Sequence, residues 1–182
     1  ALLIINHESL IATKSNRIKR AAKGRAVMEF GARRAQGIDA SVYGAKASYI
    51  AGIDGTSNVL TGKLFNIPVL GTMAHSWVQM FDTELEAFKA FAKSFPNNCV
   101  LLVDTYNTLQ SGIPNAIKTF DEILKPMGIR PKGIRLDSGD LAYLSKQARK
   151  MLDNAGYEDA QIVVSNSLDE YTIRDLLHQE AK

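Results

Sequence analysis

Short apolar segments alternate with helical patterns along most of this chain, and this alternation constrains the fold more than any other feature. The segments expected to form strands cover residues 67–71, 99–104, 132–137 and 161–166. The helices expected to follow them cover residues 83–95, 112–127, 140–155 and 169–180. Successive strands start about 30 residues apart, which is the length of a strand–helix–strand unit with parallel strands. The sequence therefore predicts an α/β protein built on parallel strands.

The absence of one glycine-rich motif indicates which kind of α/β fold to expect. The chain has no GxGxxG fingerprint of the kind that dinucleotide-binding sheets carry after their first strand. Four consecutive strand–helix units without it favour part of an irregular (β/α) barrel, preceded by a helical segment over residues 2–22. A further helix is expected over 39–51, with Asp39 as its cap, and Ser167 to Glu170 read as a capping box. Gly128 and Gly156 stand where helix C-caps belong.

Composition limits the environment in which the protein works. The single cysteine, Cys99, precedes an apolar run, so it is expected to be a buried small side chain. One cysteine allows neither an internal disulfide nor a cysteine-based zinc site, which fits a reducing, cytoplasmic compartment. No apolar run approaches the roughly 20 residues that span a bilayer, so no membrane association is expected. The chain opens without Met inside a helical pattern, which suggests a fragment.

Positive charge is concentrated in one segment. Eight of the 22 Lys and Arg residues lie between Lys14 and Arg34, where Glu29 is the only acid. Such a segment suits nucleic acid, a membrane surface or phosphorylated small molecules, or it forms a solvated helix face. Arg33 and Arg34 would suit a phosphate or carboxylate, because the guanidinium group binds these anions with two parallel hydrogen bonds. Beside Glu29, they could equally form a surface ion-pair cluster.

Polar residues follow each of the four predicted strands, at the point where its apolar run stops. These residues are His75 and Ser76, then 104–107, then 135–140, then 165–167. The carboxyl ends of parallel strands lie on one face, which is where α/β proteins bind ligands. A lone histidine is more often an interior residue held by hydrogen bonds, but four polar strand ends in succession favour a functional site.

The residue types at these strand ends indicate the chemistry. Asp104 is expected to accept a hydrogen bond from one ring nitrogen of His75, leaving the other nitrogen free as a base or nucleophile. Arg135 and Asp137, followed by Gly139, would suit sugar hydroxyls, phosphate and Mg²⁺. Asp140 reads equally well as an ordinary residue at a helix N-terminus. No set of side chains favours a transition-metal site, because His7 and His178 lie in segments with no reason to converge on His75.

Four motifs carry a resemblance to a known family. They are the runs EFGARRAQG over 29–37, SNVL over 57–60, GTMAHS over 71–76 and RLDSGD over 135–140. Together they resemble the nicotinate phosphoribosyltransferases, type II phosphoribosyltransferases of NAD salvage. The resemblance implies that nicotinate and 5-phosphoribosyl-1-pyrophosphate give nicotinate mononucleotide and pyrophosphate. It also implies Mg²⁺, and ATP hydrolysis coupled through a phosphohistidine.

The resemblance also assigns roles to individual residues. His75 would be phosphorylated and Asp104 would orient it. Arg33 and Arg34 would face the nicotinate carboxylate and the pyrophosphate, while Arg135 and Asp137 would hold the phosphoribosyl substrate. The full set of implied substrate-binding residues is Arg33, Arg34, Asn58, Ser76, Arg135, Asp137, Ser138 and Asn166.

The resemblance further implies what residues 1–182 represent. They would be the central portion of the α/β-barrel domain, without the N-terminal domain and the closing strands that carry the 5′-phosphate loop. Such a segment is expected to be inactive alone, and the intact protein is expected to be a homodimer without a nucleic-acid partner.

Three alternatives remain open at the level of sequence. A sister enzyme that uses nicotinamide is expected to have aspartate where this chain has the neutral Asn58. A basic module that binds nucleic acid would interleave aromatic residues with its cations, yet Phe30 is the only aromatic residue near the basic run. An aldolase-like barrel would need a lysine at the end of a strand, whereas Lys132 opens its strand.

Overall fold

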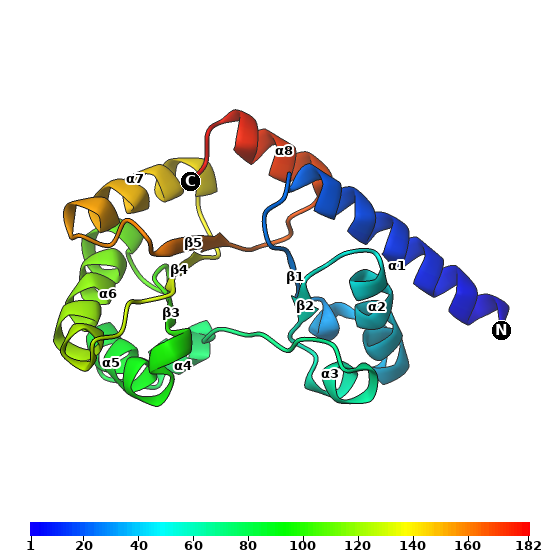
Figure 1. Ribbon diagram of the computed structural model, residues 1–182, viewed down its shortest axis with the longest axis horizontal. Coiled ribbons are helices and arrows are strands. Elements are labelled where there is room, and N and C mark those ends of the chain that lie inside the picture. Colours follow the sequence, from blue (N-terminus) through cyan, green and yellow to red (C-terminus); the bar gives the residue numbers. More distant parts are fainter. The chain divides into compact units, whose positions relative to one another are not determined.

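The computed structural model describes residues 1–182 without a gap, and the chain divides into two compact units (Figure 1). The first unit contains Ala1–Gly71 and Leu168–Asp175. The second unit contains Thr72–Ser167 and Leu176–Lys182. The architecture is mixed α/β with parallel strands, and no closed barrel forms within these residues.

The first unit contains a small parallel sheet and several helices. Its elements are α1 (Leu2–Ala21), β1 (Met28–Glu29), a 3₁₀ turn (Ala32–Arg34), α2 (Ile38–Ile50), β2 (Gly55–Thr56) and α3 (Val59–Phe65). The parallel pair places Glu29 opposite Thr56. Helix α1 packs on α2, and the buried Ser15 hydroxyl donates to the Ser48 hydroxyl at 2.9 Å. The sequence predicted α1 and α2 but missed α3, because α3 is short and its Val59 and Leu60 are exposed.

Helix caps in the first unit differ from the prediction. Helix α2 begins after Gly37, whose φ of 105° is open to glycine but strained for other residues, and no side chain caps it. Asp39 lies in the first turn of α2 instead of capping it, which corrects the prediction. Helix α3 is capped by Asn58, whose Oδ1 accepts from the backbone N–H of Thr61 at 3.1 Å.

The strand predicted over 67–71 is wrong for this chain. Val69 forms only an isolated parallel bridge with Thr56, in which Thr56 N–H donates to the Pro68 carbonyl and Leu70 N–H donates to the Thr56 carbonyl. Pro68 has no N–H to give to a ladder, and no second strand pairs with this segment. The following residues reach α4 (His75–Gln79) without regular structure.

Much of the charge on the basic first helix is neutralised within its own unit. Glu170 lies 2.5 Å from Lys14 Nζ and 2.8 Å from an Arg17 nitrogen, and Lys19 lies 2.5 Å from Asp54. The hydrogen bond from Lys19 is the main reason that the pKa of Asp54 lies below its ordinary value. The positive segment is therefore in large part a set of internal ion pairs.

The second unit contains a three-stranded parallel sheet. Its strands are β3 (Val100–Leu102), β4 (Gly133–Leu136) and β5 (Gln161–Val164), in the order β3-β4-β5. The register pairs Leu102 with Arg135, and Arg135 with Val163. Three of the four predicted strands are confirmed.

Helices surround this sheet within the second unit. They are α4, α5 (Glu84–Ser94), α6 (Ile113–Thr119) and α7 (Leu141–Asn154), and α8 (Glu170–His178) is divided between the units. The helix predicted over 112–127 is irregular, because π-helical turns (Thr108–Gly112 and Phe120–Leu124) flank α6 and a 3₁₀ turn (Lys125–Met127) ends it. The core contains fully buried side chains from β3, β4, α5 and the α6 region, namely Phe88, Leu101, Leu102, Phe120, Ile134 and Leu136.

Cys99, the single cysteine, lies in the core of the second unit. Cys99 is fully buried as expected, and burial raises the pKa of its thiol to about 12.

Gly112 stands against the end of β3, where a Cβ atom would lie 1.8 Å from the carbonyl oxygen of Val103. Only glycine fits there, so the segment after Asp104 is held close to the sheet.

The helix-end signals were only partly predictive. Gly128 and Gly156 have φ of 70° and 79° at helix ends, which confirms both. The capping box at Ser167 is wrong. Asp169 caps α8 by accepting from the backbone N–H of Thr172 at 2.8 Å, while Ser167 has a positive φ. A true capping box joins Thr83 and Glu86 at the start of α5.

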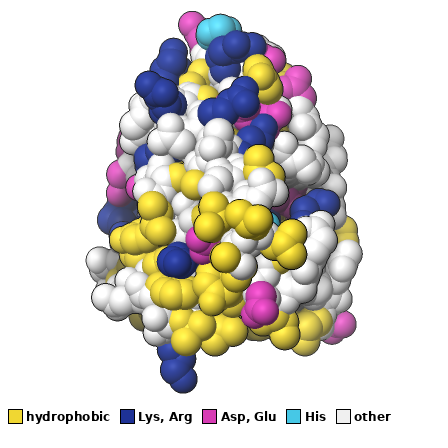
Figure 2. All heavy atoms as spheres, turned by 90° about the vertical axis from the view of Figure 1, so that its right-hand side faces the viewer, with side chains coloured by type: hydrophobic (Ala, Val, Ile, Leu, Met, Phe, Trp, Pro, Cys, Tyr) yellow, Lys and Arg dark blue, Asp and Glu magenta, His cyan; other side chains and the backbone are white.

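The exposed surface includes many large hydrophobic side chains. Figure 2 views the side of the first unit on which α1 to α3 lie, and hydrophobic side chains gather over one part of this face. The most exposed on α1 are Leu2 and Leu3, at 83% and 86%, and Ile38 and Val59 are exposed on α2 and α3. None of the helices has the length and apolar character that a membrane crossing requires.

Candidate active site

His75 stands at the start of α4, with its two ring nitrogens facing different groups. Its Nδ1 lies 3.1 Å from the Thr105 hydroxyl oxygen, just past the end of β3. Its Nε2 lies 3.4 Å from Asp137 Oδ2, just past the end of β4. The Thr105 hydroxyl can donate or accept, so it holds the ring in either tautomer. The imidazole is thus oriented and still 38% exposed to a ligand.

Asp104 is buried beside this ring, at 8% exposure, but contacts a different set of groups from the one predicted. Its Oδ2 accepts from the Asp137 backbone N–H at 2.8 Å and from the Ser138 hydroxyl at 2.6 Å. Thr105, the next residue, occupies the place on the His75 ring that the sequence assigned to Asp104. This corrects the predicted contact, because the two residues leave β3 in different directions. The other oxygen of Asp104 is buried without a hydrogen-bond partner.

Arg135 connects several parts of the second unit. Its Nε donates to the Ser165 hydroxyl at 2.8 Å and one terminal nitrogen donates to Asp137 Oδ1 at 2.8 Å. The other terminal nitrogen donates to the Thr72 hydroxyl at 2.7 Å and to the Met73 carbonyl at 3.3 Å. Arg135 therefore ties the segment that leads into His75 to the ends of β4 and β5. Its side chain is only 13% exposed.

Asp137 is the acceptor at the centre of this cluster. Burial raises the pKa of its carboxyl, but hydrogen bonds from Ser165 and Arg135, with the charge of Arg135, together lower it by more. The net pKa lies below the ordinary value, so Asp137 is ionised at neutral pH. The Asp137 carboxylate, 3.4 Å from Nε2, is placed to attract positive charge that develops on the ring.

The remaining predicted residues lie in two places. Ser76 and Asn166 are exposed in the second unit, Ser76 in the first turn of α4 and Asn166 after β5 with a φ of 95°. Arg33 and Arg34 lie in the first unit and are exposed, and neither forms an ion pair. The surface ion-pair cluster with Glu29, one of the two interpretations of this run, is therefore absent.

Asn58, also in the first unit, has a structural role. Besides capping α3, it donates from Nδ2 to the Ser41 hydroxyl at 2.7 Å. It also lines a cavity of about 290 Å³ with Ser41, Leu60 and residues of the 32–42 segment. Arg33 and Arg34 are not among the lining residues.

Sequence reasoning assigned no individual role to three contact residues of the His75 cluster. They are Thr72, Thr105 and Ser165. Each is a hydroxyl residue in a polar stretch that the sequence did single out. In these stretches the charged residues and His75 indicated a functional site, whereas a Ser or Thr residue by itself does not distinguish a site from an ordinary loop. The available signals were that Thr105 follows Asp104 directly, Thr72 lies in the motif that contains His75, and Ser165 begins the polar end of its strand.

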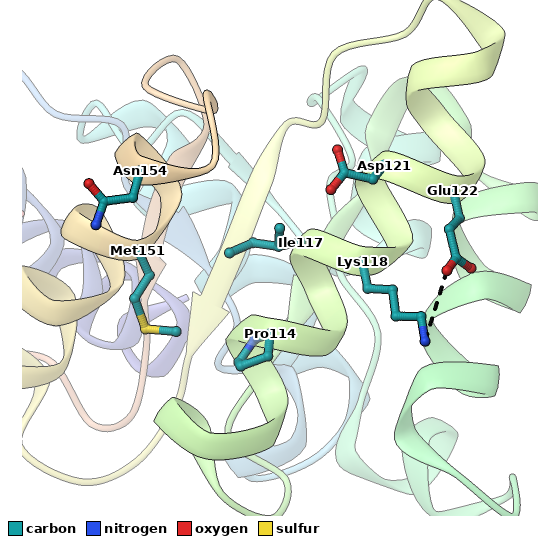
Figure 3. Close-up of a pocket in the computed structure, with 7 residues that line it drawn as sticks. All are labelled: Pro114, Ile117, Lys118, Asp121, Glu122, Met151 and Asn154. Carbon is teal, nitrogen blue, oxygen red and sulfur yellow. Dashed lines mark ion pairs between the residues drawn. The ribbon is translucent and has the colours of Figure 1, made fainter.

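A cavity of the second unit lies away from this cluster. It has a volume of about 540 Å³ and is a groove between α6 and α7 (Figure 3). Pro114, Ile117 and Met151 line it together with charged residues of the α6 side, where Lys118 pairs with Glu122 at 3.9 Å. None of its lining residues belongs to a strand end, so the groove is separate from the His75 cluster.

Comparison with known proteins gives a consistent result. The sequence profile of the nicotinate phosphoribosyltransferase (NAPRTase) family matches residues 25–182. The chain is 53% identical to nicotinate phosphoribosyltransferase of Bacillus subtilis (strain 168), over 100% of this chain and 36% of that protein. It is 39% identical to nicotinate phosphoribosyltransferase of Dictyostelium discoideum, over 98% of this chain and 38% of that protein.

Solved structures resemble the fold as well. The crystal structure of human nicotinic acid phosphoribosyltransferase matches with a TM-score of 0.87 and 31% identity, over 96% of this chain and 46% of that one. A nicotinate-nucleotide pyrophosphorylase from Pyrococcus furiosus matches with a TM-score of 0.80 and 28% identity, over 94% of this chain and 44% of that one. The chain thus spans less than half the length of the relatives it matches.

Proposed function

Because the chain belongs to the nicotinate phosphoribosyltransferase family, we propose that its protein joins nicotinate to 5-phosphoribosyl-1-pyrophosphate, giving nicotinate mononucleotide and pyrophosphate in NAD salvage. In this proposal the 182 residues are the central portion of an α/β-barrel domain whose remaining parts complete the site. The observation that carries the proposal is the oriented His75 ring between Thr105 and Asp137 at the strand ends.

His75 is proposed to accept the γ-phosphoryl group of ATP. A ring nitrogen forms a bond to phosphorus as the bond from phosphorus to the ADP oxygen breaks, and water later releases phosphate from the ring. Thr105 keeps the ring in place, and Asp137 stabilises the positive charge that develops on the imidazole. Asp104 supports this arrangement indirectly, because it holds the backbone of Asp137.

Mg²⁺ fits the residues of this cluster. The unpartnered buried oxygen of Asp104 and the Asp137 carboxylate are hard oxygen ligands. No group of three or more His, Cys, Asp or Glu side chains is arranged to hold a metal, and Mg²⁺ commonly uses one or two carboxylates together with substrate phosphates. When bound, the ion would neutralise charge on the transferring phosphates. Asp104 and Asp137 would hold it, while Ser76, Ser138 and Asn166 would contact the phosphoribosyl substrate.

Arg33 and Arg34 are proposed to bind the nicotinate carboxylate and the pyrophosphate. Their exposure and lack of ion pairs support this role. Arg135, in contrast, already donates from all three guanidinium nitrogens to protein groups. We therefore propose that Arg135 mainly positions Asp137 for the phosphoribosyl substrate. The intact protein is proposed to be a cytoplasmic homodimer.

The proposal is tested with the protein that carries this chain together with the rest of the family's length. Nicotinate and 5-phosphoribosyl-1-pyrophosphate should give nicotinate mononucleotide, and ATP should increase its formation. Nicotinamide as the better substrate would favour the sister activity. Salt-sensitive binding of random DNA without product formation would favour a nucleic-acid module, although the internal ion pairs of α1 weigh against it.

Substrate choice can be tested at Asn58. Asp is as good a helix cap as Asn, and the Ser41 hydroxyl can turn to donate, so Asn58→Asp should leave α3 intact. The added charge should repel nicotinate and raise its KM by roughly 10- to 100-fold, with a much smaller change for nicotinamide. Steady-state kinetics with both substrates measure this effect. An equal response of the two substrates would assign Asn58 to the cap alone.

A further inference from the structure

Glu29 has both carboxylate oxygens bound to neutral donors. It ends β1, directly opposite Thr56 of β2. The Thr56 hydroxyl donates to Glu29 Oε2 at 2.6 Å, and the backbone N–H of Gly31 donates to Oε1. Thr56 is only 1% exposed, so its hydroxyl is buried, and the partly buried carboxylate of Glu29 lies against it.

Two arginines close to Glu29 in sequence make this arrangement unexpected. Arg33 and Arg34 lie four and five residues after Glu29 and are exposed. An acid so close in sequence is the expected partner for an arginine, yet neither guanidinium pairs with it. The carboxylate is instead turned towards Thr56 and Gly31.

The same hydroxyl holds a second loop. The Thr56 hydroxyl oxygen accepts a hydrogen bond from the backbone N–H of Asn58 at 2.9 Å, while the same hydroxyl donates a hydrogen bond to Glu29. The backbone of Ser57 also donates to the Glu29 carbonyl at 3.0 Å. One buried hydroxyl thus connects the end of β1 with the loop before α3.

We propose that Thr56 is a positioning residue that keeps the Glu29 carboxylate away from Arg33 and Arg34, so that both arginines remain available for the anionic groups of the substrates. The inference rests on the proposed function, because that function places an anionic ligand at Arg33 and Arg34. Without the hydroxyl, Glu29 Oε2 loses its only donor. A carboxylate that has lost a hydrogen bond is then free to pair with the nearest guanidinium, which competes with an anionic ligand.

The test compares Thr56→Val with Thr56→Ser in the protein of full family length. Valine keeps the branched shape and removes the hydroxyl, whereas serine keeps the hydroxyl. We expect Thr56→Val to raise the KM for nicotinate at least tenfold and Thr56→Ser to change it less than threefold. Phosphorylation of His75 by ATP should be unchanged in both variants, because His75 and its partners lie in the second unit. An unchanged KM for nicotinate, or an equal loss of His75 phosphorylation, overturns the inference.

The double variant Glu29→Gln, Thr56→Val separates positioning from general damage. The glutamine side chain can still accept from the Gly31 N–H but carries no charge for the arginines. The KM for nicotinate should therefore return to within threefold of the wild-type value. A double variant as weak as Thr56→Val alone contradicts the inference.

A spectroscopic readout keeps the inference testable without the enzymatic activity. The guanidinium Nε–H resonances of Arg33 and Arg34 should shift in Thr56→Val and return in the double variant. If the wild type makes no nicotinate mononucleotide, the proposed function fails while this measurement still decides the pairing. Unshifted resonances in Thr56→Val overturn the inference even in an active enzyme.

Discussion

Replacement of His75 by alanine should abolish the ATP-dependent phosphorylation of the protein. The imidazole is the proposed acceptor, and its two nitrogens face Thr105 and Asp137. Loss of an activated nucleophile removes the covalent route altogether. The measurement is incubation of the full-length variant with γ-labelled ATP, followed by a test of whether the label is acid-labile.

Histidine controls are available in the same chain. His7 hydrogen-bonds the Ala40 carbonyl at 3.1 Å, and His178 ends α8. His7→Ala and His178→Ala should both retain the label, since neither residue belongs to the strand-end cluster. Equal labelling of His75→Ala and the wild type would show that the phosphoryl group goes elsewhere.

Replacement of Asp137 by alanine is expected to have the second largest effect. It removes the Asp137 acceptor of one terminal nitrogen of Arg135 and of the Ser165 hydroxyl, and it removes the carboxylate that faces His75. A lost charge-assisted hydrogen bond of this kind costs about 1.5–3 kcal/mol. The kcat/KM for 5-phosphoribosyl-1-pyrophosphate should therefore fall by roughly 10- to 150-fold. An unchanged kcat/KM would mean that the cluster is purely structural.

Asp137→Asn serves as the matched control, because it keeps an oxygen for Arg135 and removes only the charge. The pKa of Asp137 is lowered in the folded protein, so the ionised carboxylate adds stability above its unfolded pKa of about 3.9. This contribution is lost as the pH falls through the lower, folded pKa. The midpoint temperature of thermal unfolding should thus be higher for the wild type than for Asp137→Asn at pH 6. This difference should shrink below about pH 4.

Much of the fold followed from periodicity, which reports burial along each element. The strands β3 to β5 and the long helices α1, α5 and α7 each have enough residues to display their period. Two-residue strands such as β1 and β2 cannot show any period. The segment 67–71 looked like a strand because it is apolar, but pairing depends on neighbours that its sequence does not encode.

The rule that strand ends converge brought Asp104, Arg135 and Asp137 together, whereas His75 joins them from the start of α4 and not from the end of a strand. Their exact hydrogen bonds did not follow. Asp104 and Thr105 are consecutive residues, so the side chain that reaches His75 is decided by the local backbone at the end of β3. For the same reason, sequence alone could not tell that Arg135 is engaged by Thr72 and Ser165.

The ion pairs of Lys14 and Arg17 with Glu170 have a consequence for the order of events on the ribosome. The two cations leave the exit tunnel before their partner, which is translated about 155 residues later. The continuous stretch Thr72–Ser167 lies wholly between them and provides all three strands of the β3-β4-β5 sheet. Domains generally fold as units during synthesis, so the later-encoded sheet can be assembled while the earlier-encoded helix still lacks its counter-charge. The first unit therefore stays incomplete until Leu168–Asp175 has been translated, which is after the whole β3-β4-β5 sheet has been made.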